Sequence, residues 1–305
     1  MTRLRKLKWA AGLFLLVAVV TLIAFWMHPL RFYQAAAEWR LRFAGARSSF
    51  TAVAGMRIHY YVIGPPDGRA VVLVHGLGGR SEDWRSLAPY LAREGYRVFM
   101  PDLPGYGQSD RPADFSYSVP AEAEIVVGFM DALALNQVDL GGWSMGGWIV
   151  QRVAYAHPER VRRLLLFDSA GIYEKPAWDT RLFTPATAAE VDQLEFLLMP
   201  HPPRIPSFVA KDILRRSRRN GWIIHRAVGS MLLGRDTTDD LLPQLKMPVL
   251  IVWGSEDRIT PLRQGEKMHR LVPQSQFDVI QGCGHLAPGQ CATEIGPKVV
   301  EFLKQ

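Results

Sequence analysis

The sequence predicts an α/β protein whose central sheet is mostly parallel. Short apolar runs alternate with longer helical patterns along most of the 305 residues. Runs such as residues 70–74 are continuously apolar, which is typical of strands buried on both faces of a parallel sheet. A glycine-rich turn at residues 142–147 lies between a strand-like run and a helical one. Together these observations indicate one large domain with helices flanking the sheet.

The individual elements follow from the same patterns. Strands are expected at residues 57–63, 70–74, 96–100, 137–141, 162–167, 247–253 and 277–280. Helices are expected at residues 81–93, 121–135, 148–156 and 262–271. Between residues 171 and 241 the alternation stops and prolines recur among short helix-like pieces. This stretch is predicted to be a helical cap inserted into a core formed by residues 48–170 and 242–305.

The N-terminal segment predicts a membrane anchor. Residues 1–8 form a basic tail, and residues 9–30 contain no Asp, Glu, Lys or Arg, a length that suits a transmembrane helix. Trp9 and Trp26 lie near its two ends, where membrane interfaces favour such rings. A cleaved signal peptide is the main alternative, but its apolar region is usually about 7–15 residues long. A buried core helix is a weaker alternative, because the segment has no polar face.

The charges around this segment predict its orientation. Four basic residues precede the span closely, whereas those that follow it are spread over an amphipathic juxtamembrane helix expected at residues 31–47. The positive-inside rule therefore favours a cytoplasmic N-terminus and an extracytoplasmic main domain.

Composition narrows the class of partner. The formal net charge is +7, yet no nucleic-acid-binding motif accompanies it. The basic residues near the N-terminus and near Arg215 favour an anionic membrane surface instead. The two cysteines, Cys283 and Cys291, form neither a disulfide framework nor a metal-ligand pattern, and a bridge between them depends on geometry. No metal and no cofactor are expected.

The glycine-rich turn predicts a nucleophilic serine. Residues 142–146 have the sequence Gly-Trp-Ser-Met-Gly, preceded by a strand and followed by a helix. A strand, a tight turn with Ser144 at its tip, and a helix make up a nucleophile elbow. The glycines permit a turn in which a side chain would collide with its neighbours. The alternative is an ordinary strand-to-helix turn that contains a serine by chance.

A second glycine-rich loop, residues 75–79, follows the strand at residues 70–74. Its backbone can approach a reacting centre, so the N–H groups of Leu77 and Met145 are the expected donors of an oxyanion hole. His75 is expected to order this loop by hydrogen bonding rather than to act as a base. The acids in the loop at residues 102–110 are likewise expected to be hydrogen-bond acceptors that order it.

The partners of the serine lie late in the chain. Asp257 follows the strand at residues 247–253, and His285 lies in a glycine-flanked loop after the strand at residues 277–280. Ser, Asp and His in this order are expected of a nucleophile-elbow architecture. Asp257 is the preferred acid, with Glu256 as the adjacent alternative and Asp168 as the more distant one. His285 would take the proton from Ser144, and Asp257 would orient the imidazole.

The predicted cap carries a basic cluster, and its default interpretation is a solvated helix face. The sharper hypothesis is contact with lipid headgroups, because the domain follows a membrane anchor. The cluster consists of Lys211, Arg215, Arg216, Arg218 and Arg219.

As a set, these motifs resemble the α/β-hydrolase superfamily from about Ser48 to the C-terminus. With the anchor, the chain looks most like membrane-bound monoacylglycerol lipases. That resemblance implies a serine esterase of lipid metabolism that acts on carboxylic esters of lipids, with monoacylglycerol as the expected substrate. The expected partners are this lipid ester and membrane lipids, and nucleic acid is not expected as a partner. The serine argues against dehalogenase and epoxide-hydrolase branches, which use an aspartate. Small-ester esterases and C–C bond hydrolases remain alternatives, the latter sharing the Ser-Met-Gly-Gly run. A non-catalytic tethered binding protein is the alternative from another class.

Overall fold

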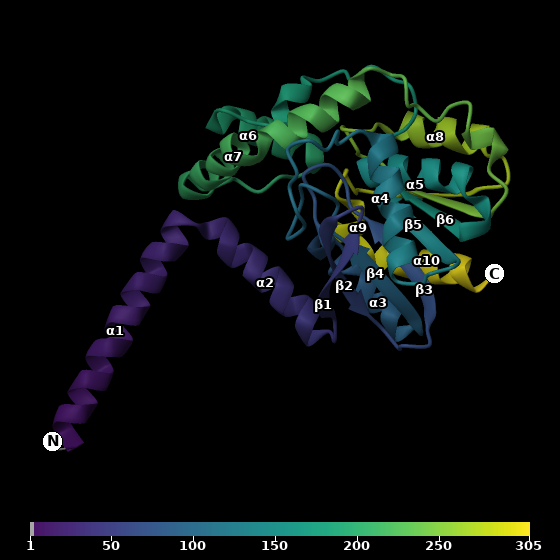
Figure 1. The fold of residues 1–305 in the computed structure, drawn as a ribbon. Helices are drawn as coiled ribbons and strands as arrows, with labels where there is room; N and C mark the ends of the chain where they lie inside the picture. The colour runs from purple at the N-terminus through teal and green to yellow at the C-terminus, as the bar shows by residue number, and fades with distance from the viewer. Residues whose placement is uncertain (1–2) are drawn as a thin grey trace.

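The computed structural model describes residues 3–305 and contains an eight-stranded sheet in the order β1-β2-β4-β3-β5-β6-β7-β8 (Figure 1). Strand β2 pairs antiparallel with β1 and β4, and all other pairs are parallel. The α/β-hydrolase fold with a mostly parallel sheet is therefore confirmed. The strands are β1 (Arg47–Val53), β2 (Met56–Ile63), β3 (Arg69–Val74), β4 (Tyr96–Pro101), β5 (Val138–Trp143), β6 (Val161–Phe167), β7 (Val249–Gly254) and β8 (Gln276–Ile280).

Helices cover both faces of the sheet and create two apolar cores. On one face, α4 (Val119–Ala132), α5 (Met145–Ala156) and α8 (Leu262–Leu271) pack against strand side chains such as those of Val72 and Ile251. On the other face, α3 (Leu87–Arg93) and α10 (Ala292–Lys304) pack against Leu73 and Val252. The alternate residues of β3 and β7 thus enter opposite cores, which explains why these runs are apolar throughout.

Short elements complete the core domain. They are the 3₁₀ helices η1 (Ser81–Trp84), η2 (Pro158–Arg160) and η4 (Leu242–Gln244) and the short helix α9 (Ala287–Gln290).

The structure differs from the sequence-based expectations at several ends. The helix predicted at residues 81–93 is divided into η1 and α3, because Asp83 accepts the backbone N–H of Arg80 and closes a separate turn. Helix α4 begins at Val119, where the Ser118 hydroxyl caps it. The edge strand β1 was not predicted, since its mainly polar sequence lacks an apolar face.

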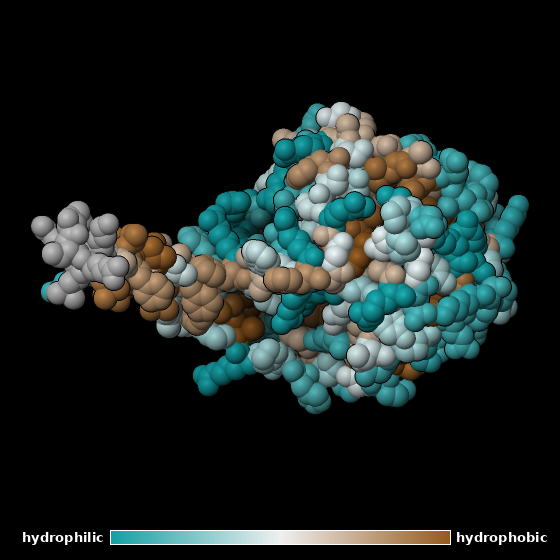
Figure 2. Space-filling model, turned by 90° about the horizontal axis from the view of Figure 1, so that it is seen from below, coloured by the Kyte–Doolittle hydropathy of each residue, from teal (hydrophilic) through white to brown (hydrophobic). Residues whose placement is uncertain are grey.

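The N-terminal segment forms two helices that meet at a bend (Figure 1). Of the predicted basic tail, residues 1–2 lie outside the described range, and residues 3–8 belong to α1 (Arg3–Met27). Within α1, Leu7–Met27 is long and apolar enough to cross a bilayer, and none of it is buried against the rest of the chain. Figure 2 shows this helix projecting from a mostly polar body. Helix α2 (Pro29–Phe43) begins immediately after His28, so the juxtamembrane helix starts two residues earlier and ends four residues earlier than expected.

The cap lies between β6 and β7 and contains η3 (Thr180–Phe183), α6 (Ala188–Leu198) and α7 (Ser207–Leu232). Instead of several short pieces, its second half is one helix of 26 residues, because the recurrent prolines end at Pro206. Figure 1 shows α6 and α7 beyond the upper end of the sheet. At its N-terminal end, α7 brings Phe208 against Trp26 of α1, with ring centroids 4.5 Å apart.

Candidate active site

Ser144 lies at the sharp turn between β5 and α5. Its backbone has φ 55° and ψ −121°, the left-handed region that non-glycine residues rarely adopt. A Cβ atom on Gly142 would overlap the carbonyl oxygen of Gly146, and one on Gly146 would overlap that of Val74. The Gly-x-Ser-x-Gly pattern is therefore required by the close approach of β5, α5 and β3 around the serine.

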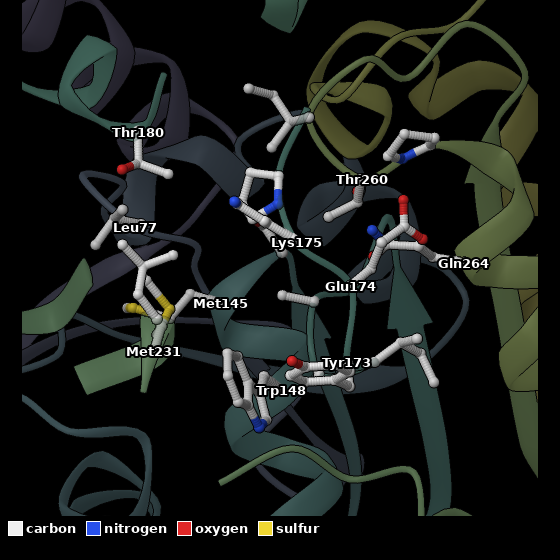
Figure 3. Close-up of a pocket in the computed structure, with 18 of the residues that line it drawn as sticks. Leu77, Met145, Trp148, Tyr173, Glu174, Lys175, Thr180, Met231, Thr260 and Gln264 are labelled. Carbon is white, nitrogen blue, oxygen red and sulfur yellow. The ribbon is translucent and has the colours of Figure 1, made fainter. Parts of the chain in front are cut away.

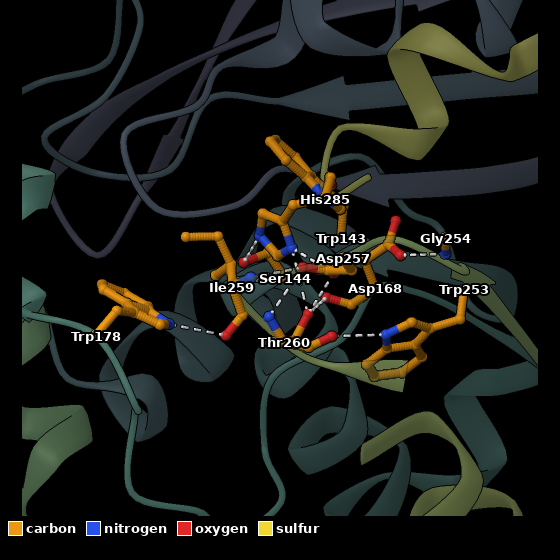
Figure 4. Close-up of polar contacts among 10 residues, drawn as sticks. All are labelled: Trp143, Ser144, Asp168, Trp178, Trp253, Gly254, Asp257, Ile259, Thr260 and His285. Carbon is orange, nitrogen blue, oxygen red and sulfur yellow. Dashed lines mark hydrogen bonds and ion pairs between the residues drawn. The ribbon is translucent and has the colours of Figure 1, made fainter. Parts of the chain in front are cut away.

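The structure brings three of the predicted site residues into one hydrogen-bonded chain (Figure 4). His285 Nε2 lies 2.8 Å from Ser144 Oγ, and His285 Nδ1 lies 2.8 Å from Asp257 Oδ2. Oδ1 of Asp257 accepts the backbone N–H groups of Ile259 and Thr260 at 2.8 and 3.0 Å. These bonds fix the orientation of the Asp257 carboxylate. The arrangement allows His285 to remove the hydroxyl proton of Ser144 while a carboxylate holds the imidazole.

The loop before η1 contributes to the cavity around Ser144. Leu77 and Met145 line one cavity together with Ser144, and Met145 opens α5 (Figure 3). His75 Nδ1 lies 2.8 Å from the Gly76 carbonyl oxygen, and His75 Nε2 lies 3.0 Å from the Leu103 nitrogen. A ring that donates from Nδ1 and accepts at Nε2 is neutral, and burial lowers the pKa of His75 in agreement. His75 thus orders the loop, as expected.

Asp102 orders the neighbouring loop. Its carboxylate accepts the backbone N–H groups of Ser81 and Gln108 and contacts His59 Nδ1 at 2.7 Å. Burial by itself would raise the pKa of Asp102, but its hydrogen bonds to His59 and to the backbone N–H of Ser81 help to lower it to about 2. This acid is a hydrogen-bond acceptor within the loop, as predicted.

A cavity of about 470 Å³ opens over Ser144 (Figure 3). Its walls come from the core loops and from the cap, so the insertion covers the serine. The apolar lining includes Trp148, Ile172, Pro176, Trp178, Phe183, Val228, Met231, Leu232 and Ile259. Polar side chains also line it, among them Glu174 and Arg263, which form an ion pair. This combination of an apolar wall and a few polar groups is typical of small-molecule sites.

Comparisons with known proteins agree with this fold. A family model described as alpha/beta hydrolase fold matches residues 69–194 and 229–289, which is more than half of the chain. The chain belongs to the α/β-hydrolase family.

Relatives of this hydrolase include both lipases and enzymes of another reaction. A 2-hydroxymuconate semialdehyde hydrolase of Pseudomonas putida is 31% identical over 252 residues, covering 78% of this chain and 88% of the relative. Lipase 1 of Psychrobacter immobilis is 27% identical over 253 residues, covering 78% of each. Among solved structures, a membrane phospholipase A has a TM-score of 0.82 at 26% identity and covers 97% of this chain and 98% of its own.

A lipase from Acinetobacter baumannii AYE, described as putative in its structure report, has a TM-score of 0.79 at 26% identity and covers 89% of this chain and 95% of its own. The hydrolase assignment is shared by all of these relatives, and lipases recur among them.

The two alternative acids of this hydrolase have partners other than the imidazole of His285. Glu256 contacts Arg258 at 4.0 Å rather than the imidazole. Asp168, at the end of β6, is fully buried, and its Oδ1 accepts the backbone N–H of Gly254 at 2.7 Å. Burial and then the charge of Asp257 raise the pKa of Asp168 well above its usual value. Burial therefore favours the neutral form of Asp168, and the imidazole of His285 contacts Asp257 instead, at 2.8 Å.

Sequence reasoning missed Thr260. Its Oγ1 lies 2.7 Å from Asp257 Oδ2, 3.2 Å from His285 Nδ1 and 3.1 Å from the Asp168 carbonyl oxygen. Thr260 connects the two acids and fixes the carboxylate of Asp257. Its position three residues after Asp257, in a loop that returns to the carboxylate, is the signal that could have indicated it.

A disulfide closes the loop that carries His285. Cys283 and Cys291 are bonded, with Cα atoms 6.5 Å apart, and His285 lies between them in the sequence. The sequence left this pairing open, and the fold of the loop around α9 brings the two side chains together.

Proposed function

We propose that this hydrolase is a membrane-anchored serine esterase that cleaves carboxylic esters of lipids. The observation that carries the proposal is the hydrogen-bonded chain from Ser144 through His285 to Asp257, which opens into an apolar cavity. An ester carbonyl placed at Ser144 Oγ is attacked as His285 Nε2 takes the hydroxyl proton. Asp257 holds the imidazole in the required tautomer and stabilises its charged form.

The tetrahedral oxyanion would be stabilised by the backbone N–H groups of Leu77 and Met145. Removal of one such donor in a known enzyme costs roughly 100-fold to 1,000-fold in kcat. His285 then delivers its proton to the leaving alcohol, which leaves an acyl group on Ser144. Water attacks this acyl-enzyme by the same route in reverse, releasing the carboxylic acid and restoring the serine hydroxyl.

Monoacylglycerol is the proposed substrate. The cavity's apolar wall suits one acyl chain, and the polar side chains of Glu174, Thr180 and Arg263 along the same cavity suit glycerol hydroxyl groups. A long acyl chain partitions into a bilayer, so an enzyme held there by α1 meets this substrate at high local concentration.

The catalytic domain is proposed to lie on the extracytoplasmic side. The dense basic residues before the span favour this orientation. The disulfide between Cys283 and Cys291 also suits an oxidising compartment. Protease added to intact cells should digest the domain; full protection until the membrane is permeabilised would contradict the orientation.

A second candidate activity is hydrolysis of acyl esters in phospholipids. The membrane phospholipase A structure favours it, because that protein matches this chain along 97% of its length at 26% identity. C–C bond hydrolysis is the third possibility, supported by the 31% identity to the semialdehyde hydrolase.

The deciding experiment compares fatty-acid release from a long-chain 1-monoacylglycerol and from a diacyl phospholipid, using the purified full chain and Ser144→Ala. Ser49→Ala, on the edge strand β1, is the matched control. We expect fast release from monoacylglycerol that disappears only in Ser144→Ala. Preference for the diacyl phospholipid would select the second candidate. Labelling of Ser144 by a fluorophosphonate without any lipid hydrolysis would discard lipid esters, and absence of labelling would favour a non-catalytic binding protein.

A further inference from the structure

The N-terminal half of the cap helix α7 is joined to the bend between α1 and α2. Phe208 packs on the rings of Trp26 and Phe25, at centroid distances of 4.5 and 5.8 Å. Arg215 Nη1 donates to the Met27 carbonyl oxygen at 2.8 Å, and Asp212 Oδ2 accepts the Leu30 N–H at 3.1 Å. The cap therefore contacts the end of the apolar segment directly.

Beside this contact, five arginines from four parts of the chain converge. We call them the arginine cluster: Arg31 of α2, Arg80 before η1, Arg111 of the loop before α4, and Arg216 and Arg219 of α7. The guanidinium groups of Arg216 and Arg111 donate hydrogen bonds to neutral partners. Arg216 Nη2 donates to Gln34 Oε1 at 3.1 Å, and Arg111 Nη1 donates to Asn220 Oδ1 at 3.0 Å. These bonds tie α2 and the loop to adjacent turns of α7.

The charge of the arginine cluster is not neutralised by ion pairs. Within residues 3–305, no carboxylate oxygen lies within 4.0 Å of a side-chain nitrogen of the five arginines. The neighbouring Asp212 of α7 forms its ion pair with Arg215, which is not a member of the cluster. Burial lowers the pKa of Arg216, as do the charges of Arg80, Arg31 and Arg219, while Asp212 offsets part of this effect. Partial burial and the charges of Arg219 and Arg80 lower the pKa of Arg111, while Asp102 offsets part of this effect. The guanidinium groups thus repel one another, and a bound anion would relieve that repulsion.

The position of the arginine cluster indicates which anion it meets. Trp26 lies at the end of the apolar span, where aromatic rings favour the headgroup level of a bilayer. Arg31 follows only four residues after Met27, and α7 contacts both segments. Lipid phosphates are the anions found at that depth, and guanidinium groups match phosphate oxygens in a bidentate geometry.

We propose that the arginine cluster binds the phosphate of an anionic phospholipid of the membrane in which α1 is anchored. This inference rests on the proposed anchor but not on the proposed catalytic reaction. The excess of positive charge selects a lipid with a net negative charge over a zwitterionic one. The site is separate from the substrate cavity, whose lining contains none of the five arginines. A lipid bound there would hold α2, the loop after Leu77 and the cap helix together.

The test measures the melting temperature of the full chain in dodecyl maltoside micelles. Phosphatidylglycerol, phosphatidylcholine or inorganic phosphate is added at matched concentrations. We expect phosphatidylglycerol alone to raise the melting temperature at a low mole fraction of lipid in the micelle. This effect should weaken in high salt. Arg216→Gln/Arg219→Gln should require at least tenfold more phosphatidylglycerol for half the shift. The matched control, Arg93→Gln/Arg270→Gln, removes two exposed charges from α3 and α8 and should respond like the wild type.

Three results would overturn the proposal. The first is an equal rise in melting temperature with inorganic phosphate, which would assign the arginine cluster to a soluble anion. The second is an equal rise with phosphatidylcholine. The third is a response of the double variant to phosphatidylglycerol that equals that of the wild type. If that variant does not fold, Arg31→Gln and Arg111→Gln change exposed members and give the same test. Because the readout is thermal stability, a chain that hydrolyses no lipid ester still answers the question.

Discussion

Removal of the disulfide tests whether the His285 loop depends on its covalent closure. The variant Cys283→Ala/Cys291→Ala deletes the bond without placing a polar group at Cys283, which is only 3% exposed. Two other contacts hold the loop: His285 N–H donates to the Leu198 carbonyl oxygen at 3.0 Å, and Trp143 Nε1 donates to the His285 carbonyl oxygen at 2.7 Å. We therefore expect the variant to fold, with a less stable and less well-placed histidine.

The magnitude follows from the short loop. The sequence separation of the two cysteines is 8. In the chain-entropy account, closing a loop of this size stabilises the folded state by about 2.5 kcal/mol. For a domain larger than 150 residues, that corresponds to a decrease of roughly 5–10 °C in the melting temperature. A shift of His285 by an ångström would add a loss of up to about 100-fold in the acylation rate.

The assay follows thermal unfolding and the rate of fluorophosphonate labelling at Ser144, for the wild type with and without dithiothreitol and for the double variant. Reduction should make the wild type behave like the variant, and dithiothreitol should leave the variant unchanged. A double variant with the wild-type melting temperature and labelling rate would refute the argument that this bond stabilises the loop.

Three further predictions use the same protein. Asp257→Asn should lower kcat on a soluble ester by about 10³–10⁴-fold, because the amide disfavours the required tautomer. Asp168→Asn places a neutral amide where burial already disfavours the charged carboxylate, so it should retain activity within about tenfold. Similar losses of kcat in both variants would contradict this division of roles. Burial, followed by the charge of Asp102, raises the pKa of Glu82 from 4.5 to about 7. As the pH rises, the unfolded chain releases this proton before the folded chain does. Between pH 4.5 and 7 the wild type should therefore lose roughly 3 kcal/mol of stability relative to Glu82→Gln. A difference in unfolding free energy between the two proteins that does not vary between pH 5 and 8 would exclude this effect. Gly146→Ala should destabilise the fold by about 3 kcal/mol through overlap with Val74, while Gly229→Ala, in an open part of α7, should be neutral or stabilising in the same melting assay.

The sequence predicted the parts of the fold that depend on local patterns. Buried parallel strands such as β3 and β7 are apolar throughout, and the elbow around Ser144 needs glycines at fixed positions, so both are visible without a structure. The edge strand β1 was missed because its pairing with β2, rather than its own composition, makes it a strand.

The site was predictable where chain order and loop position constrain it, as for Asp257 and His285. The contribution of Thr260 and the raised pKa of Asp168 depend on how the ends of β6 and β7 meet in space. The arginine cluster is also non-local, since it joins α2, two loops and α7. The basic cluster expected on the cap was predicted as one helix face, but Arg215 contacts the bend after α1 and Arg216 contacts Gln34 of α2.

The backbone angle at Ser144 has an evolutionary consequence. A non-glycine residue at φ 55° and ψ −121° costs of order 1–3 kcal/mol, and glycine would adopt the same angles without that cost. The fold would therefore gain stability by losing its nucleophile. A lineage released from selection for hydrolysis would be expected to drift towards glycine at this position, so retention of serine there in related genomes would itself be a record of continued use.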